Sequence, residues 1–206
     1  MSLTEEAYRL LKWKILSMEL APGTFINEQG LVEATGFGRA PIHQALHQLQ
    51  SDGLVEIRPR KGAQVKVWSP ADFQHLMEAR IPLECAMVRL AASRAEPSDI
   101  LDLQEKLDQG PALLQALDRE SLMRLDHLFH QSLAAFARSP VLAELVEKLH
   151  HRSTLLWYVP ISGRKEYEVV LRQHQDILDA VAAHDCDAAA AAMFTHISDL
   201  AHAPNL

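Results

Sequence analysis

Apolar residues recur at intervals of three and four positions through the first quarter of the chain, and this spacing predicts short helices that each bury one face. Turn and capping residues divide these helices. Pro22-Gly23 stops the first one, Asn27 is placed to cap the second, and Gly36 ends the second and begins a tight turn. The three helices are expected at residues 4–18, 28–35 and 39–52.

Two short segments of strand-forming residues follow the third helix, at 54–57 and 63–67. Between them, residues 58–62 combine three basic side chains with Pro and Gly, which favours a basic hairpin tip. Three helices and a hairpin in this order are typical of a winged helix-turn-helix, whose recognition helix enters the major groove of DNA. Because such modules also serve as protein-interaction domains, the pattern alone leaves both functions open.

Beyond Ser69-Pro70, which we interpret as a hinge, the apolar periodicity predicts helices only. Pro, Gly and polar turn residues separate most of them. They are expected at residues 70–94, 97–108, 111–137, 140–159, 164–184 and 186–203. The predicted fold class is therefore mainly α, with a winged helix-turn-helix DNA-binding domain over 1–68 and an all-α helical bundle over 69–206.

The composition is that of a soluble globular protein. Of the 206 residues, 48% are apolar and 23% are charged. No apolar run is long enough to span a bilayer, and the N-terminus lacks the apolar segment of a signal peptide. Cys85 and Cys186 are isolated and lack the spacing of a metal or redox motif. These features predict reduced thiols, a cytoplasmic location and no membrane partner.

Charge is divided unevenly along the chain. Residues 1–67 carry eight basic and seven acidic side chains, whereas the whole chain has a net charge of −7, so the remainder is strongly acidic. A protein with a negative net charge must bind DNA through a local basic face, and here that face is small. One copy would bind phosphates weakly, which favours a homodimer that contacts two half-sites of double-stranded operator DNA.

Seven residues of the predicted winged module are candidates for DNA contacts. An Arg where the recognition helix begins can reach guanine or a phosphate, and the His and Gln of the next turn can hydrogen-bond base edges. Basic wing residues can contact phosphates, and a wing Gly lets the backbone approach the minor groove. The candidates are Arg39, His43, Gln44, Arg58, Arg60, Lys61 and Gly62.

The helical region holds a constellation of metal-ligating residue types. Asp126 and His130 are four apart and share one helix face, while His174 and His196 each fall in the apolar stripe of a later helix. Burying three imidazoles and a carboxylate is costly unless a partner such as a divalent ion satisfies them. This set suits Zn²⁺ first, with Ni²⁺ or Mn²⁺ as other candidates, while hydrogen-bonded core histidines are the alternative.

The other histidines show no comparable inward grouping, so we expect them at the surface or on the DNA side. They are His43, His47, His75, His127, His150, His151, His184 and His202.

Residues 8–67 resemble the N-terminal domain of the GntR family of bacterial transcription regulators. The family pattern is Pro-Gly, then Gly-x-Ser-Arg-x-Pro-x-Arg-Glu-Ala-Leu, then Leu, Gly-Leu and a wing that contains Gly. The matching residues are Pro22-Gly23, Gly36, Arg39, Pro41, Ala45-Leu46, Leu49, Gly53-Leu54 and Gly62. The resemblance implies a winged fold that binds operator DNA.

Several polar positions depart from the family pattern. Gly38 replaces Ser or Thr, His43 replaces a DNA-contacting Arg, Gln44 replaces Glu, and Gln29 stands where a basic residue is common. Because a His lacks the permanent charge and forked donors of an Arg, we hypothesise an atypical operator or weaker binding than in a typical relative.

Residues 73–201 resemble the FCD ligand-sensing domain of the FadR-like GntR subfamily. Glu78-Ala-Arg80, Leu83-Glu84 and Leu90-Ala-Ala92 match its opening helix, and the segment 126–130 matches its Asp-x-x-Phe-His metal motif. The resemblance assigns Asp126, His130, His174 and His196 to a metal at the floor of an effector pocket. It also places Arg80 in that pocket, although an Arg that is exposed or paired with a helix remains the alternative.

One family feature is missing from the helical region. The loop after the motif helix usually has an Asn near Pro140, where this chain has Arg138-Ser139.

Together these patterns predict a transcription regulator, not an enzyme, whose operator affinity responds to a small carboxylate effector bound at the metal. Three alternatives stay open. The first is a metal-dependent enzyme, because an ion with open positions can activate water. The second is a constitutive DNA-binding protein with a structural metal, and the third is a winged domain that no longer binds DNA.

Overall fold

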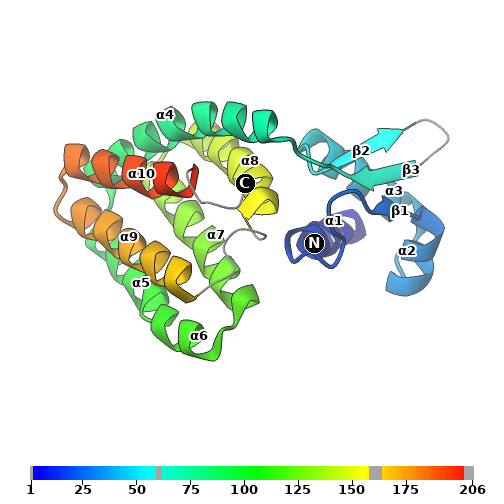
Figure 1. Ribbon diagram of the computed structural model, residues 1–206, viewed down its shortest axis with the longest axis horizontal. Helices are drawn as coiled ribbons and strands as arrows, with labels where there is room; N and C mark the ends of the chain where they lie inside the picture. Colours follow the sequence, from blue (N-terminus) through cyan, green and yellow to red (C-terminus); the bar gives the residue numbers. More distant parts are fainter. Residues whose placement is uncertain (1, 59–61, 158–163, 202–206) are drawn as a thin grey trace. The chain divides into compact units, whose positions relative to one another are not determined.

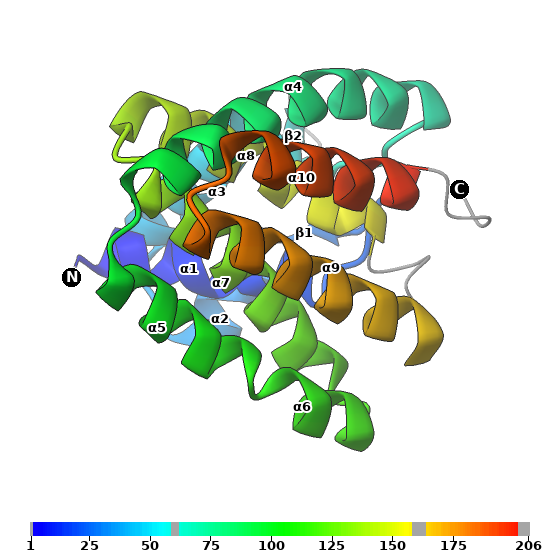
Figure 2. The same ribbon diagram turned by 90° about the vertical axis from the view of Figure 1, so that its left-hand side faces the viewer.

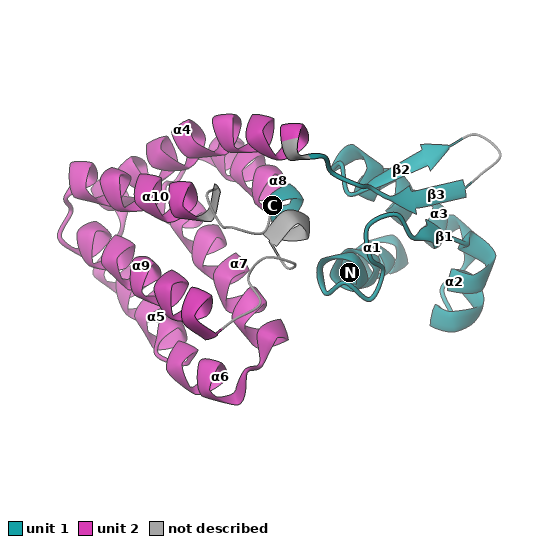
Figure 3. Cartoon of the chain, viewed as in Figure 1, with its two compact units in different colours: residues 1–70, 151–159 teal, residues 71–150, 160–206 magenta. Residues whose placement is uncertain are grey.

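The computed structural model describes residues 2–58, 62–157 and 164–201 (Figure 1). The chain divides into two compact units (Figure 3). The first comprises Met1–Pro70 with His151–Val159, and the second comprises Ala71–His150 with Pro160–Leu206. Among the described residues, no helix has both the length and the apolar character needed to cross a membrane.

The first unit combines three helices with a three-stranded antiparallel sheet in the order β1-β3-β2. This arrangement confirms the predicted winged helix-turn-helix. Strand β1 was not predicted from the sequence, because two residues are too few to show an alternating pattern. The elements are α1 (Leu3–Leu16), β1 (Phe25–Ile26), α2 (Glu28–Thr35), α3 (Arg39–Ser51), β2 (Val55–Arg58) and β3 (Gly62–Val65).

Local side-chain contacts set the helix ends of this unit. Asn27 accepts hydrogen bonds from the backbone N–H groups of Gln29 and Gly30, which caps α2 as predicted. Gly36 ends α2 in the left-handed conformation, with φ of 74°. Gly38 stands at the N-cap of α3 without a side chain to cap it. The predicted boundaries of α2 and α3 therefore agree with the structure to within one residue.

The apolar stripe of α3 forms the core of the first unit. Helix α1 packs against α3. The side chains of both helices that are completely buried are Ala7, Leu11, Ile15, Ile42, Ala45, Leu46 and Leu49. Burying these apolar residues stabilises the fold. The opposite, polar face of α3 takes no part in this packing and stays available for other contacts.

The second unit is all helix over its described residues. Helix α9 lies between α10 and α5, as Figures 1 and 2 both show. Helix α7 packs against α5 and α6. The helices from α4 onward are α4 (Pro70–Arg94), α5 (Pro97–Leu107), α6 (Gly110–Ala116), α7 (Arg119–Phe136), α8 (Pro140–Trp157), α9 (Arg164–Ala182) and α10 (Cys186–Ala201). They confirm the predicted mainly α fold class.

The single helix predicted over 111–137 is wrong, because two helices occupy that segment. Helix α6 ends at Ala116, and the next residue, Leu117, adopts a left-handed conformation with φ of 52°. Asp118 then begins α7 by accepting a hydrogen bond from the backbone N–H of Ser121 at 3.1 Å. The sequence pattern missed this break because Leu117 continues the apolar stripe and neither Gly nor Pro marks the turn.

The remaining helix ends differ little from the prediction. Helix α9 ends at Ala182, and His184 follows with φ of 55°, before Asp185 caps α10 by accepting from the N–H of Ala188 at 2.9 Å. The predicted ends at 159 and 203 lie outside the described residues.

Replacing Gly36 with Ala is expected to lower the free energy of unfolding by about 1–2 kcal/mol, because a Cβ disfavours the left-handed backbone. Among the described residues no atom lies within 4 Å of that Cβ, so a clash contributes nothing. Gly36→Asn should lose clearly less, since Asn tolerates this conformation. Urea unfolding followed by circular dichroism measures both, and equal losses would contradict the conformational explanation.

Candidate metal centre and nucleic-acid interface

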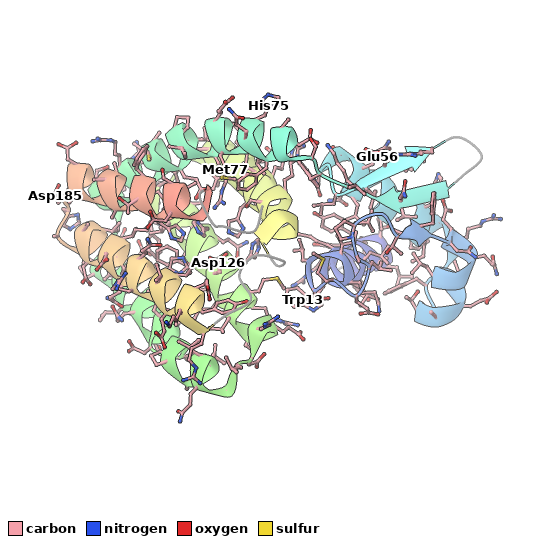
Figure 4. All side chains as sticks on the ribbon, viewed as in Figure 1. Trp13, Glu56, His75, Met77, Asp126 and Asp185 are labelled. Atoms are coloured by element: carbon pink, nitrogen blue, oxygen red, sulfur yellow. The ribbon has the colours of Figure 1, made fainter. Side chains whose placement is uncertain are left out.

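Three helices of the second unit bring together the four predicted metal ligands. Helix α7 supplies Asp126 and His130, α9 supplies His174, and α10 supplies His196. Figure 4 labels Asp126 among the side chains of the second unit. One ligand atom of each residue lies within 4.8 Å of those of the other three. The histidines are at most 2% exposed, whereas the Asp126 side chain is 31% exposed. The cluster is therefore buried, with its carboxylate on the side that solvent can reach.

The spacing of the ligand atoms fits a small divalent ion. Nε2 of His196 lies 3.3 Å from Nε2 of His130. Oδ1 of Asp126 lies 3.4 Å from Nε2 of His174 and 3.9 Å from Nε2 of His130. Ligands of a tetrahedral ion with bonds of about 2.0–2.1 Å lie about 3.3–3.4 Å apart. Two of these three separations match those expected around zinc, and the third, between Asp126 and His130, is about 0.5 Å longer.

His174 gives an independent reason to place an ion there. Its side chain is 1% exposed, and among the described residues neither ring nitrogen has a hydrogen-bond partner. The ring is stacked on Phe129, with centroids 4.0 Å apart and an interplanar angle of 16°, which holds it in place. Leaving buried ring nitrogens unsatisfied costs free energy, and a metal on Nε2 would remove the part of that cost that comes from Nε2. The residues present therefore fit a bound metal.

A buried ion pair orients His130. Nδ1 of His130 lies 2.8 Å from Oε2 of Glu84, and Nε of Arg80 donates to Oε1 of the same carboxylate at 2.5 Å. Burial alone would raise the pKa of Glu84, but the guanidinium of Arg80 and then His130 hold that pKa below its usual value. Glu84 therefore stays ionised, and its contact with Nδ1 leaves Nε2 of His130 facing the other ligands.

Arg80 is buried and paired, unlike a residue that lines an open pocket. Its side chain is 2% exposed and pairs with Glu84 one turn along the same helix. This is the helix-pairing alternative raised by the sequence, and contact with an effector remains a prediction.

Gln173 orients His196. Its amide nitrogen donates to Oδ2 of Asp199 at 2.6 Å, which leaves the amide oxygen to accept from Nδ1 of His196 at 3.1 Å. Nε2 of His196 then carries the lone pair that faces the cluster. Sequence reasoning missed both Glu84 and Gln173 in this role, because neither belongs to a histidine pattern and their partners are set by packing between helices.

The prediction that His150 and His151 lie at the surface is wrong, since they are 3% and 2% exposed. Nε2 of His150 lies 3.1 Å from Oδ2 of Asp126. His150 therefore contacts the carboxylate oxygen of Asp126 that does not face His174. His127, also expected at the surface, is partly buried, and its Nδ1 lies 3.3 Å from Nδ1 of His150. The signal that could have found His150 is its position four residues after the buried Val146 in α8.

The electrostatics of the cluster suit metal binding. Burial alone would raise the pKa of Asp126, but the hydrogen bond from His150 and the neighbouring imidazoles hold it well below its usual value. Burial, with the charges of His174 and His130, lowers the pKa of His196 well below that of a free imidazole. A deprotonated carboxylate and a neutral imidazole are the forms that bind metals.

A cavity of about 180 Å³ is lined by residues of α7 and α8, His130 and His150 among them. Its lining mixes small apolar side chains with imidazoles, an amide and a carboxylate. The lining residues are His127, His130, Gln131, Ala134, Ala135, Ala143, Val146, Glu147 and His150.

The candidate DNA contacts of α3 share one exposed face of the first unit. Arg39, His43 and Gln44 are all exposed, as predicted from the helix pattern. His43 is not isolated on that face, because its Nδ1 lies 3.4 Å from the Glu28 carboxylate and its Nε2 lies 3.2 Å from Nε2 of His47. The amide oxygen of Gln44 accepts a hydrogen bond at 2.8 Å from the hydroxyl of a residue in α1, Thr4. Contact with a base would therefore exchange existing partners of His43 and Gln44.

The wing residues are only partly described. Arg58 is exposed at the end of β2 and pairs with Glu56 at 3.0 Å, which offsets its charge. Gly62 is exposed at the start of β3 with φ of 82°, a conformation that favours Gly. Arg60 and Lys61 lie outside the described residues.

Two family descriptions match most of the chain. Residues 3–65 match the bacterial regulatory proteins of the gntR family, and residues 75–199 match the FCD domain. The HTH-type transcriptional repressor RspR of Escherichia coli (strain K12) is 30% identical over 196 residues, which cover 95% of this chain and 86% of that protein. The HTH-type transcriptional repressor NanR of Enterobacter sp. (strain 638) is 27% identical over 92% of this chain and 80% of that protein.

Solved structures show the same fold. E. coli McbR/YncC has a TM-score of 0.88 at 23% identity, and the match covers 97% of this chain and 95% of that chain. A putative transcriptional regulator GntR from Rhodococcus sp. RHA1 has a TM-score of 0.82 at 24% identity, with coverage of 98% and 97%. The chain therefore belongs to the GntR family of bacterial regulators, with an FCD domain, and is a transcriptional regulator of that family.

Lowering the pH from about 7.5 to 5.5 is expected to lower the melting temperature of the chelated, metal-free protein. The pKa values of His150 and His196 are lowered in the fold. The unfolded chain therefore binds protons below a pH of about 6.5 that the folded chain does not, and stability is lost as the pH falls. Differential scanning calorimetry measures this change, and a melting temperature that stays level or rises on acidification would contradict it.

Proposed function

We propose that this regulator binds operator DNA with an affinity that a small organic acid controls, by binding at a divalent metal ion in the second unit. The observation that carries the proposal is the buried cluster of Asp126, His130, His174 and His196, whose ligand atoms lie within 4.8 Å of one another. A bundle core has no need of three imidazoles for packing alone, so a ligand function accounts best for their burial.

The donor set favours zinc, with nickel or manganese as the other candidates. Three imidazoles and one carboxylate suit each of these ions. When bound, the ion supplies a positive centre that attracts a carboxylate. Asp126 is the most exposed of the four ligands, which supports entry of a small acid from its side. The pairing of Arg80 with Glu84 means that an effector contact with Arg80 would share this guanidinium with the carboxylate of Glu84.

Control of DNA binding requires an effector that prefers one conformation of the protein over another. The four ligands come from α7, α9 and α10, so a ligand that changes the coordination also acts on the packing of these three helices. We infer that the protein acts as a homodimer in which such a change alters how two winged modules meet two half-sites. The relatives RspR and NanR are named as transcriptional repressors, which supports operator binding.

His174→Ala and His196→Ala are expected to lose most of the metal bound by the wild-type protein, as measured by elemental analysis. A panel of small mono- and dicarboxylic acids should include one that shifts wild-type affinity for a selected DNA duplex by about fivefold or more, a typical coupling between two sites. Fluorescence anisotropy reports this shift, which should vanish in both variants.

His75→Ala is the matched control, because His75 is an exposed histidine of α4. It should keep both the metal and the response. Full metal content in His174→Ala and His196→Ala would remove the proposed centre. Metal binding without any response to the acids would leave a structural ion and remove the sensing role.

Arg39→Ala is expected to weaken binding to a duplex selected from a random pool by about tenfold, the cost of one base or phosphate contact. His43→Arg is expected to strengthen binding and to steepen the dependence of log affinity on log salt concentration by about one unit, because it adds a cation. The exposed Arg172 of α9 provides the control variant Arg172→Ala, which should bind like the wild type. Unchanged affinity in Arg39→Ala would contradict the proposed interface.

A further inference from the structure

Two histidines lie one turn apart on the exposed face of α3. His43 and His47 are four positions apart, so their side chains lie on the same side of the helix, and both are exposed. Their Nε2 atoms are 3.2 Å apart, and the rings meet edge to face with centroids 4.6 Å apart. The two Nε2 atoms therefore approach each other on a face that solvent reaches.

The separation of these nitrogens is close to that of two ligands on one metal ion. Ligands of a tetrahedral ion with bonds of about 2.0–2.1 Å lie about 3.3–3.4 Å apart, so a separation of 3.2 Å needs little adjustment. Two histidines four positions apart also bind the ion in zinc sites on helices. Imidazole suits zinc, copper and nickel. The pair therefore has both the donor type and the spacing of a two-ligand metal site.

Glu28 of α2 orients His43 for this role. Both oxygens of its carboxylate lie 3.4 Å from Nδ1 of His43. An ionised carboxylate accepts hydrogen bonds and donates none, so a neutral His43 carries its proton on Nδ1 and its lone pair on Nε2. Histidines that bind metals commonly have a carboxylate on the outer nitrogen in this way, which fixes the ring and makes the other nitrogen a better ligand.

The contact between the two rings is a hydrogen bond when no ion is bound. With its lone pair on Nε2, His43 accepts from the Nε2–H of His47. A divalent ion replaces this shared hydrogen, and His47 then carries its proton on Nδ1 after exchange with water, so no net proton is released. Because the side chain of His47 is exposed, this change of tautomer requires no rearrangement of the core.

We propose that His43 and His47 bind a divalent transition-metal ion, zinc among them, on the exposed face of α3, and that this ion competes with DNA for that face. His43 cannot offer Nε2 to a base edge while the ion holds it. Because it has two protein ligands instead of four, this site binds zinc more weakly than the proposed buried centre. The competition with DNA rests on the proposed function of α3, whereas binding of the ion does not.

Retention on a column of immobilised Zn²⁺ tests binding of the ion, because the column reaches exposed histidines and not buried ones. The untagged full chain should be retained and should need imidazole for elution. His43→Ala and His47→Ala should each elute earlier, because only one histidine of the pair remains. Circular dichroism confirms that each variant folds.

The matched control for spacing is the double variant His47→Ala with Gln48→His. It keeps the number of histidines but sets the pair five positions apart, on different sides of the helix, so it should elute as early as His47→Ala. His75→Ala, which removes an exposed histidine of α4, should elute like the wild type. Elution of the wild type together with His47→Ala would overturn the site, as would retention of the spacing control as tight as that of the wild type.

Fluorescence anisotropy with a duplex selected from a random pool tests the competition. Chelated wild type and His47→Ala should bind the duplex alike. Excess zinc should then weaken binding of the wild type about fivefold or more relative to its effect on His47→Ala, a typical coupling between two ligands. An equal effect on both proteins would contradict the competition. Absence of duplex binding by the chelated protein would contradict the proposed function and with it the competition, while the column alone decides whether the ion binds.

Discussion

The burial of three imidazoles and one carboxylate at a single point is the constraint on which the second unit depends. His130, His174 and His196 are withdrawn from water almost completely, and such groups destabilise a helical core unless each nitrogen has a partner. Glu84 and Gln173 supply partners for the outer nitrogens of His130 and His196. The inner nitrogens then converge with Asp126, so that the ligand atoms lie within 4.8 Å of one another, which is the arrangement of a candidate metal site.

Apolar periodicity predicted most of this arrangement, because it states which face of a helix is buried. It placed His174 and His196 inward because each replaces an apolar residue in a stripe, and it placed Asp126 beside His130 because one helical turn separates them. Periodicity says nothing about which helices meet. The roles of Glu84 on α4 and of His150 on α8 depend on contacts across the bundle, so the sequence left both outside the candidate site.

In the winged module too, the local sequence pattern predicted the helices and their exposed faces but did not predict the contacts between helices. The apolar residues of α3, the cap at Asn27 and the turn at Gly36 predicted its helices closely. The sequence also placed Arg39, His43 and Gln44 on the outer face, which the structure confirms. It did not reveal that His43 contacts Glu28, since this pairing joins two helices. A polar face that is already occupied by internal contacts makes base recognition a competition between partners, which is consistent with an unusual operator.

X-ray absorption at the zinc edge of the zinc-loaded protein identifies the atoms that coordinate the bound ion. A centre built from Asp126, His130, His174 and His196 should give a shell of nitrogen and oxygen ligands at about 2.0–2.1 Å, with the multiple-scattering pattern of about three imidazoles. His196→Ala should lose most of this signal, because it should lose most of the bound metal. A shell that contains sulfur, or oxygen ligands without imidazole scattering, would contradict a metal centre built from these four residues.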